Sequence, residues 1–183
     1  MGGARPSRAS LVVCSVATVL LLIAIAGARR PARLVNSGPP PWPAPSGDAA
    51  GAGVRAAGLP LLSTPDVVTR YAIHLDVRMN GTAVPVPRGI GVDWHAHAVA
   101  PLYTSDDTGI VHVRSDASAP VFRIGQFFDE WQVPLRDCTV YVDGARQHAA
   151  PGDVVLAPHQ EITVSFGGSD AQVPNRYSFQ AGT

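Results

Sequence analysis

The sequence predicts an α+β domain that is mainly β: a β-grasp-like mixed sheet with one short helix and an N-terminal β-hairpin, preceded by one transmembrane helix. Residues 73–79 alternate between apolar and polar side chains, the pattern of a half-buried strand. Residues 125–131 read GQFFDEW, in which aromatic side chains four positions apart mark one face of a helix. Residues 11–28 form an apolar run without a charge.

The N-terminal region predicts attachment to a membrane. Residues 11–28 read LVVCSVATVLLLIAIAGA and have arginines on both sides. A helix of that length spans roughly 27 Å at about 1.5 Å per residue, close to the hydrocarbon thickness of a bilayer. We expect a single-pass anchor in the cell membrane, with residues 1–10 in the cytoplasm and the C-terminal domain extracytoplasmic. Because small residues end the run, secretion after signal cleavage is the alternative.

The composition changes between the apolar run and the domain. Residues 29–65 are rich in proline, glycine and alanine. Such a segment has little apolar surface to bury against its conformational entropy, so we predict a disordered linker in which Trp42 is exposed. The predicted domain covers residues 66–167, and residues 168–183 form a C-terminal tail.

The domain is expected to begin with a β-hairpin. Odd-numbered residues from 73 to 79 are apolar and the even-numbered residues between them are polar. Asn80-Gly81 follows, and both residues readily adopt the positive φ angles of a type I′ turn. Val84 and Val86 are then the inward-facing residues of the returning strand.

The remaining elements complete the predicted fold. Apolar runs at residues 110–113 and 121–124 predict two strands, and the aromatic segment after them predicts a helix that ends before Pro134. Residues 138–142 and 161–166 predict two more strands. This order of strand, strand, helix, strand, strand is that of a β-grasp fold, with the helix aromatics packed against the sheet.

Composition and motifs exclude several classes of protein. The formal net charge is zero, and all 14 basic residues are arginines without a long basic run, so we expect no nucleic-acid partner. Cys14 and Cys138 lie too far apart along the chain to suggest a disulfide framework. A turn explains the single D-T-G at residues 107–109, and no G-x-S-x-G occurs. We therefore expect no enzymatic activity.

Two segments resemble a family of small, exported and mostly uncharacterised prokaryotic domains. Residues 101–113 (PLYTSDDTGIVHV) and 122–135 (FRIGQFFDEWQVPL) are similar to the patterns L-H-T-H-D-x-S-G-I-I-H-I and F-x-L-G-Q-F-F-D-x-W-G. The resemblance covers residues 70–167 and implies a histidine-rich segment that could hold a metal ion. Tyr103 and Ser105 stand where that family has histidines, whereas His112 is kept, so the first motif is degenerate.

Histidines define the candidate metal site. His95 and His97 are two residues apart, so in a strand both imidazoles would point to one side and could bind one copper(II) or zinc ion. His74 or His112 would complete the site from a neighbouring strand. The same residues also fit a solvent-facing strand or loop, which is the interpretation we favour.

These observations lead to one functional expectation and one alternative. We expect a membrane-tethered, extracytoplasmic, non-enzymatic binding or interaction domain, whose partner is an unknown envelope protein or small ligand. No cofactor is certain. The alternative is an extracytoplasmic copper- or zinc-binding domain that uses the His95 and His97 pair.

Overall fold

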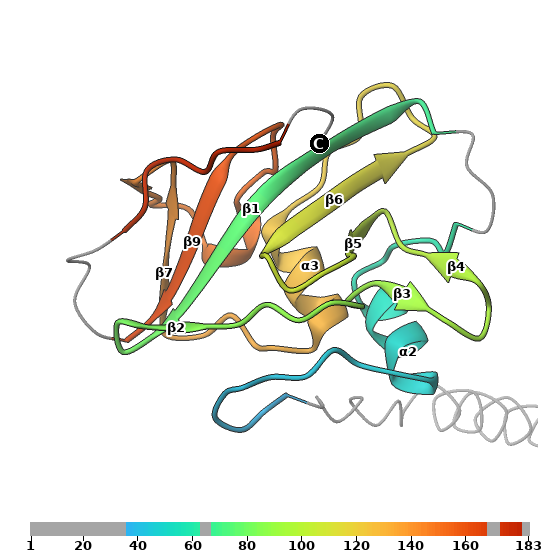
Figure 1. Ribbon diagram of the computed structural model, residues 1–183, viewed down its shortest axis with the longest axis horizontal. Helices are drawn as coiled ribbons and strands as arrows, with labels where there is room; N and C mark the ends of the chain where they lie inside the picture. The colour runs from blue at the N-terminus through green and yellow to red at the C-terminus, as the bar shows by residue number, and fades with distance from the viewer. Residues whose placement is uncertain (1–35, 63–66, 168–172, 181–183) are drawn as a thin grey trace, which may run out of the picture. The chain divides into compact units, whose positions relative to one another are not determined.

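The computed structural model describes residues 36–62, 67–167 and 173–180, all within one compact unit, Leu34–Thr183 (Figure 1). This part of the chain is mainly β-sheet with two α-helices, which confirms the predicted α+β class. No helix among the described residues is long and apolar enough to cross a membrane. The predicted anchor at residues 11–28 lies outside the described residues.

Within the described residues, one mixed sheet of seven strands organises the domain. Its order is β5-β6-β1-β9-β7-β8, and β2 also pairs with β1. The central pair, β1 and β9, is parallel, and every other pairing in the sheet is antiparallel. The strands are β1 (Thr69–Met79), β2 (Thr82–Val84), β5 (Leu102–Thr104), β6 (Ile110–Ser115), β7 (Cys138–Val142), β8 (Ala145–Arg146) and β9 (Glu161–Phe166). A separate hairpin consists of β3 (Val92–Asp93) and β4 (Ala98–Val99).

The predicted N-terminal hairpin is confirmed. Met79 pairs with Thr82 across the turn, and the two turn residues have φ angles of 51° at Asn80 and 81° at Gly81. Both values lie in the left-handed region that a type I′ turn requires. The returning strand ends at Val84, and Val86 is buried just beyond it.

The predicted helix is confirmed, and it begins one turn earlier than the aromatic residues. It is α3 (Ile124–Trp131), and the Arg123 N–H donates to Gln126 Oε1 at 3.0 Å across its first turn. The predicted strand at residues 121–124 is wrong, because Ile124 joins the buried helix face and Arg123 makes only an isolated bridge to Val155. Ile124, Phe127, Phe128 and Trp131 recur at the spacing of one helix face. This helical spacing outweighs the short apolar run at residues 121–124 that predicted a strand.

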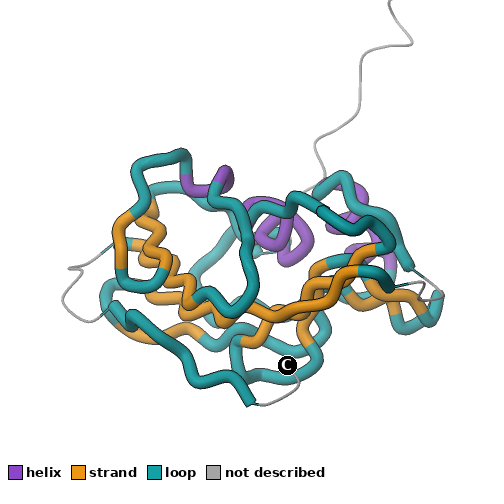
Figure 2. Tube along the Cα trace, turned by 90° about the horizontal axis from the view of Figure 1, so that it is seen from above, coloured by secondary structure: helices purple, strands orange, loops and turns teal. Residues whose placement is uncertain are grey.

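The core lies between α3 and one face of the sheet, as expected. Figure 2 shows the helices on one side of the sheet and the end of the described chain on the other. Phe128 contacts Phe166 of β9 with ring centroids 6.4 Å apart, and Trp131 lies 5.6 Å from Phe128. Odd-numbered residues of β1 and even-numbered residues of β9 supply the sheet side of this core: Ile73, Leu75, Val77, Ile162, Val164 and Phe166.

The predicted disordered linker is wrong for residues 36–62. They include a second helix, α2 (Asp48–Ala56), and Trp42 is only 6% exposed. The Trp42 ring lies edge-on to Trp131 at 5.8 Å, and the Trp131 indole N–H donates to the Trp42 carbonyl at 3.2 Å. A Cβ at Gly53 of α2 would lie 2.5 Å from the Glu130 carbonyl oxygen. Glycine and alanine thus let α2 approach α3 closely, and one large indole supplies the buried surface.

We predict that Trp42→Ala destabilises the chain by about 3 to 5 kcal/mol, because truncating a buried aromatic removes apolar contacts and leaves a cavity. The matched control is Trp94→Ala, since Trp94 is 63% exposed and such substitutions usually change stability by less than about 0.5 kcal/mol. Urea unfolding followed by circular dichroism measures both variants. Equal unfolding midpoints for the two would show that residues 36–62 do not contribute to the folded domain.

Candidate functional site

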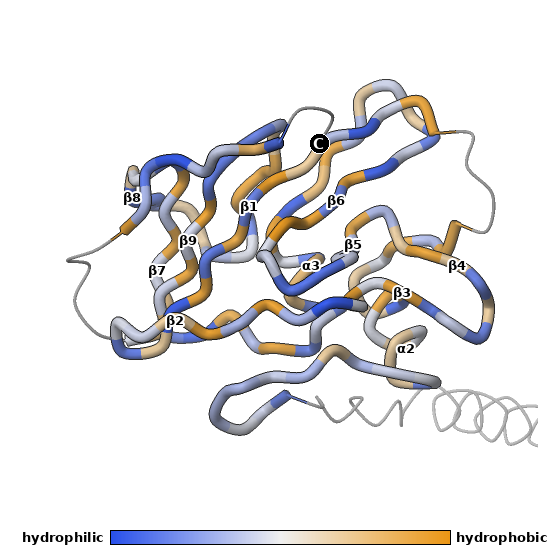
Figure 3. The backbone as a smooth tube through the Cα atoms, in the orientation of Figure 1, coloured by the Kyte–Doolittle hydropathy of each residue, from blue (hydrophilic) through white to orange (hydrophobic). Residues whose placement is uncertain are grey.

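The sheet face opposite the helices carries most of the ionisable side chains of the strands. Hydrophilic and hydrophobic residues alternate along β1 and β6 (Figure 3), so each strand presents its polar residues to this side. We call it the polar face. Its residues are Arg70, His74, Asp76 and Arg78 of β1, Tyr103 of β5, His112 and Arg114 of β6, Thr139 and Tyr141 of β7, and Glu161, Thr163 and Ser165 of β9.

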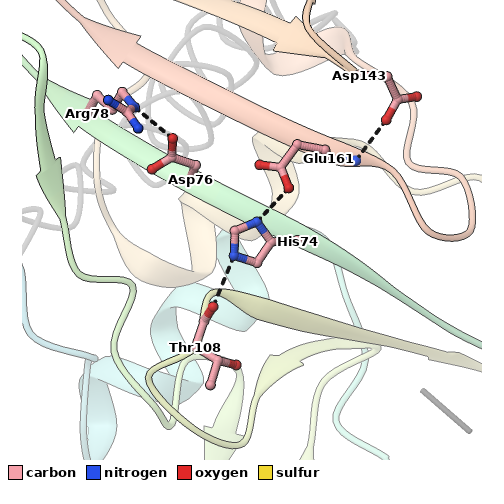
Figure 4. Close-up of polar contacts among 6 residues, drawn as sticks. All are labelled: His74, Asp76, Arg78, Thr108, Asp143 and Glu161. Carbon is pink, nitrogen blue, oxygen red and sulfur yellow. Dashed lines mark hydrogen bonds and ion pairs between the residues drawn. The ribbon is translucent and has the colours of Figure 1, made fainter. Parts of the chain in front are cut away.

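A buried carboxylate and a histidine form the centre of the polar face. His74 Nδ1 lies 2.7 Å from Glu161 Oε2, and His74 Nε2 lies 3.1 Å from the Thr108 carbonyl oxygen (Figure 4). The Glu161 side chain is 1% exposed, while its backbone N–H donates to Asp143 Oδ1 at 2.9 Å. A carbonyl can only accept, so Nε2 carries a proton. A carboxylate oxygen also only accepts. The hydrogen bond between His74 Nδ1 and Glu161 Oε2 at 2.7 Å therefore needs a second proton, either on Nδ1 or on the carboxyl group.

The C-terminal segment, residues 173–180, covers this central pair. The Tyr177 ring stacks on the His74 ring with centroids 3.9 Å apart and planes 7° apart, and Phe179 contacts Tyr177 edge-on at 5.0 Å. Beside the pair, Arg78 Nε donates to Asp76 Oδ2 at 2.7 Å. The two acids at the centre of the polar face, Glu161 and Asp76, are therefore already paired with His74 and Arg78 of the same chain.

The other half of the polar face lies on β5, β6 and the start of β1. Together with Ser105, the residue just after β5, we call it the open half: Arg70, Tyr103, Ser105, His112 and Arg114. The Tyr103 ring stacks on His112 at 5.0 Å, and the Arg114 guanidinium lies over the Tyr103 ring, 5.0 Å from its centroid. Ser105 Oγ lies 2.9 Å from His112 Nε2. Arg70 faces Arg114 directly across β1 and β6. His112 and Arg114 thus both pack against the Tyr103 ring, and a second arginine faces Arg114 across the strands.

The arginines set the electrostatics of the open half. Burial lowers the pKa of the His112 imidazole below its usual 6.5, and Arg114 and Arg70 lower it further against an opposing effect of Asp106. Burial raises the pKa of the Tyr103 phenol, which the two arginines partly offset. His112 is therefore mainly neutral near pH 7, and the positive charge of the open half comes from arginine.

The expected metal-binding histidines do not form one site. His95 and His97 lie in the turn between β3 and β4, where the His97 φ of 48° breaks the extended geometry that would align both imidazoles. The prediction that they share one side of a strand is wrong. His74 and His112 are on the polar face, each with partners of its own. In the part of the chain that the structure describes, no group of three His, Cys, Asp or Glu side chains could hold a metal ion.

The turn that carries these histidines is itself well ordered by Asp93. Its Oδ1 accepts the backbone N–H groups of His95 at 3.0 Å and Ala96 at 2.9 Å. This side-chain turn leaves Trp94, His95 and His97 exposed at the tip of the hairpin. The favoured interpretation of the sequence left a solvent-facing strand or loop open, and in the structure these residues form an exposed turn.

The positions singled out by the family resemblance do converge. Tyr103 and Ser105, where that family has histidines, both contact His112 in this chain. The β5–β6 pairing explains this convergence, because Tyr103 and His112 are direct partners across the two strands. Sequence spacing identified the segment as important, but the stacked arrangement and the arginines beside it depend on strand pairing.

A groove of about 470 Å³ lies beside α3, on the helix side of the sheet. Arg123 and Arg136 line it together with Asp129 and Asp153, so its positive and negative side chains balance. Arg123 is already engaged, because its guanidinium donates to the Asp153 carbonyl at 2.9 Å. The groove has the volume of a small-ligand pocket but no charge preference that identifies a ligand.

Glu130 is a second buried acid, away from the polar face. It is 1% exposed, and neither carboxyl oxygen has a hydrogen-bond partner among the described residues. Burial, with a smaller contribution from the Asp129 charge, raises the pKa of Glu130 well above 4.5. A Cβ at Gly91 would lie 2.1 Å from the Leu102 carbonyl oxygen and 3.2 Å from Glu130 Oε2, so glycine is needed there mainly for the approach of Leu102 and also leaves room for the carboxyl group.

Comparisons with known proteins give no relative for this chain. It matches no protein-family profile, no curated protein and no solved structure. The functional argument therefore depends on the geometry of the polar face.

We predict that stability falls as pH rises above about 4.5 and that Glu130→Gln removes much of this dependence. The folded state keeps the Glu130 proton after the unfolded chain has lost it. Each pH unit between the unfolded and the raised folded pKa then costs about 1.4 kcal/mol. The advantage of the variant should therefore grow with pH in urea unfolding at about pH 5, 6.5 and 8.

The control for this measurement is Asp116→Asn, which neutralises an exposed carboxylate. It should leave the pH dependence of stability as in the wild type. If Glu130→Gln and the wild type show parallel pH profiles, Glu130 is ionised in the folded chain.

Proposed function

We propose that this protein is a membrane-tethered, extracytoplasmic, non-enzymatic binding domain whose open half contacts an envelope protein or a small ligand. One observation carries the proposal: the acids at the centre of the polar face are covered by the chain itself, whereas Arg70 and Arg114 face each other and neither forms an ion pair with a described carboxylate. Among the described residues, the ion pairs of the chain are His74 with Glu161 and Arg78 with Asp76. Positive charge concentrated at one ordered patch favours an external partner.

The stacking in the open half supports recognition as its role. The Tyr103 ring contacts both the His112 ring and the Arg114 guanidinium, so these three side chains are held in one arrangement before any partner arrives. Tyr103 itself is buried, whereas Arg70 is exposed and Arg114 half-buried, and arginine is among the side chains most often responsible for binding energy at interfaces. Copper or zinc binding is not proposed, since the four expected histidines do not share a site.

For the finer fold we propose a β-grasp arrangement. Support comes from the strand order: β1 and β9, the first and last strands of the sheet in sequence, are parallel neighbours at its centre. β6 lies beside β1 and β7 lies beside β9. The segment that contains α3 connects β6 to β7 across one face of the sheet. The β1–β2 hairpin lies at the end of β1 that extends past β6.

The tether and the location are proposed from the sequence. The uncharged run at residues 11–28 is long enough to cross a bilayer, and the resemblance to exported domains agrees with an extracytoplasmic position. Zero net charge without a basic run argues against a nucleic-acid partner.

We predict that the full chain fractionates with membranes and that protease added outside spheroplasts degrades its C-terminal domain. An antibody against the C-terminus follows both results. If a mature form is released into the medium, the apolar run is a cleaved signal peptide and not an anchor. Protection from external protease would contradict an extracytoplasmic domain.

We also predict that a photoreactive amino acid at Ser105, on the open half, forms a light-dependent adduct in intact cells. The matched control carries it at Arg136, an exposed residue beside α3. The adduct should vanish when Arg70→Gln and Arg114→Gln are added, because both charges that attract the partner are gone. The mass of the purified protein distinguishes an envelope protein from a small ligand. Equal adducts at both positions, or none at Ser105, would contradict the proposed surface.

A further inference from the structure

The open half has a charge pattern that specifies the chemistry of its ligand. We propose that it binds an oxyanion, a phosphate or sulfate group, between Arg70 and Arg114 beside the Tyr103 ring. This inference rests on the proposed function and narrows it from a binding surface to a class of ligand.

The facing arginines are the first argument. Arg70 and Arg114 are direct partners across the antiparallel strands β1 and β6, on the same side of the sheet. Like charges at such positions destabilise a sheet, because their Cβ atoms are only about 4.5 to 5.5 Å apart. Neither arginine belongs to an ion pair within the described residues. An anion bound between them converts this repulsion into two charge-assisted contacts.

The arrangement of Arg114 is the second argument. Its Nε is buried and has no hydrogen-bond partner among the described residues. The guanidinium is fixed over the Tyr103 ring, 5.0 Å from its centroid, so its donors are presented in one orientation. A planar guanidinium held in this way matches the paired oxygens of a phosphate or sulfate group.

The neighbouring groups suit an oxyanion rather than a cation. Burial, Arg114 and Arg70 lower the pKa of His112, so this imidazole is mainly neutral near pH 7 and leaves the arginines as the charged groups. Asp106 is the acid that acts on His112, and its Oδ1 is already occupied by the backbone N–H of Thr108 at 2.9 Å and by the Thr108 hydroxyl. The Ser105 hydroxyl is already engaged, 2.9 Å from His112 Nε2 and 3.5 Å from Asp106 Oδ2, so Arg70 and Arg114 are the groups left to contact an oxyanion.

The test uses the full chain in a mild detergent and inorganic phosphate, sulfate and chloride at equal ionic strength. Isothermal calorimetry and the melting temperature should show binding of phosphate and sulfate but not of chloride. Arg70→Gln with Arg114→Gln should weaken this binding by about tenfold or more, because hydrogen bonds that involve ionised groups are stronger than those between neutral groups. Arg55→Gln with Arg136→Gln removes the same formal charge from exposed positions on α2 and beside α3, outside the polar face, and should bind like the wild type.

Folding of the double variant is checked by its melting transition in chloride, which should stay cooperative and close to that of the wild type, because the lost repulsion between the arginines offsets the lost contact of Arg114 with Tyr103. If the double variant binds phosphate and sulfate as the wild type does, the arginines do not hold the anion and the proposal is overturned. Unchanged calorimetry of the wild type with phosphate and sulfate would overturn it too. If both double variants lose phosphate and sulfate binding equally, the anions are attracted by the overall charge of the protein and not by the open half, which would overturn the proposal.

Vesicles distinguish the two sources of the anion. Binding to phosphatidylglycerol over phosphatidylcholine vesicles that depends on Arg70 and Arg114 identifies a lipid headgroup, whereas binding of inorganic phosphate alone identifies a soluble ligand. The photoreactive chain separates this inference from the proposed function. If the Ser105 adduct forms and depends on the arginines but phosphate and sulfate do not bind, only the oxyanion inference is overturned. If neither the adduct nor anion binding is observed, the proposed binding surface is overturned as well.

Discussion

The parallel pairing of β1 with β9 is the constraint on which the rest of this structure depends. It joins positions 87 residues apart, His74 and Glu161, at the centre of the sheet. Forming such a distant contact requires closing a long loop, which is entropically unfavourable until apolar surface is buried. The same register places three apolar residues of each strand against α3 and their polar neighbours on the opposite side. Core and polar face are thus two consequences of one strand pairing.

The N-terminal residues extend this core. Trp42 reaches the aromatic group of α3 and β9, with its ring 5.8 Å from Trp131 and 5.4 Å from Phe166. Asn36 donates from its side-chain amide to the Trp131 carbonyl at 2.8 Å, beyond the end of the helix ladder. A segment with the composition of a linker therefore belongs to the folded domain, because a few specific contacts replace the continuous apolar pattern that usually signals burial.

The polar face has two halves that differ in how their charges are compensated. At the centre, His74, Glu161 and Tyr177 come from β1, β9 and the C-terminal segment, and together they bury an acid with a histidine beneath an aromatic ring. On the open half, stacking orders Tyr103, His112 and Arg114 while positive charge stays in excess. The charges at the centre of the polar face are paired, whereas the arginines of the open half are in no ion pair of the described residues. The proposed binding surface therefore lies on β5, β6 and the start of β1.

The sequence by itself determined the elements whose signals are local: the Asn80-Gly81 turn, the strands β1, β6, β7 and β9, the aromatic face of α3 and the α+β class. Only the tertiary structure decided that Trp42 is buried, that residues 121–124 are not a strand and that His95 and His97 occupy a turn. It also brought Arg70 opposite Arg114 and Tyr177 onto His74. Periodicity reports which side of its own element a residue takes, whereas its partner depends on strand register and on chain segments far away in the sequence.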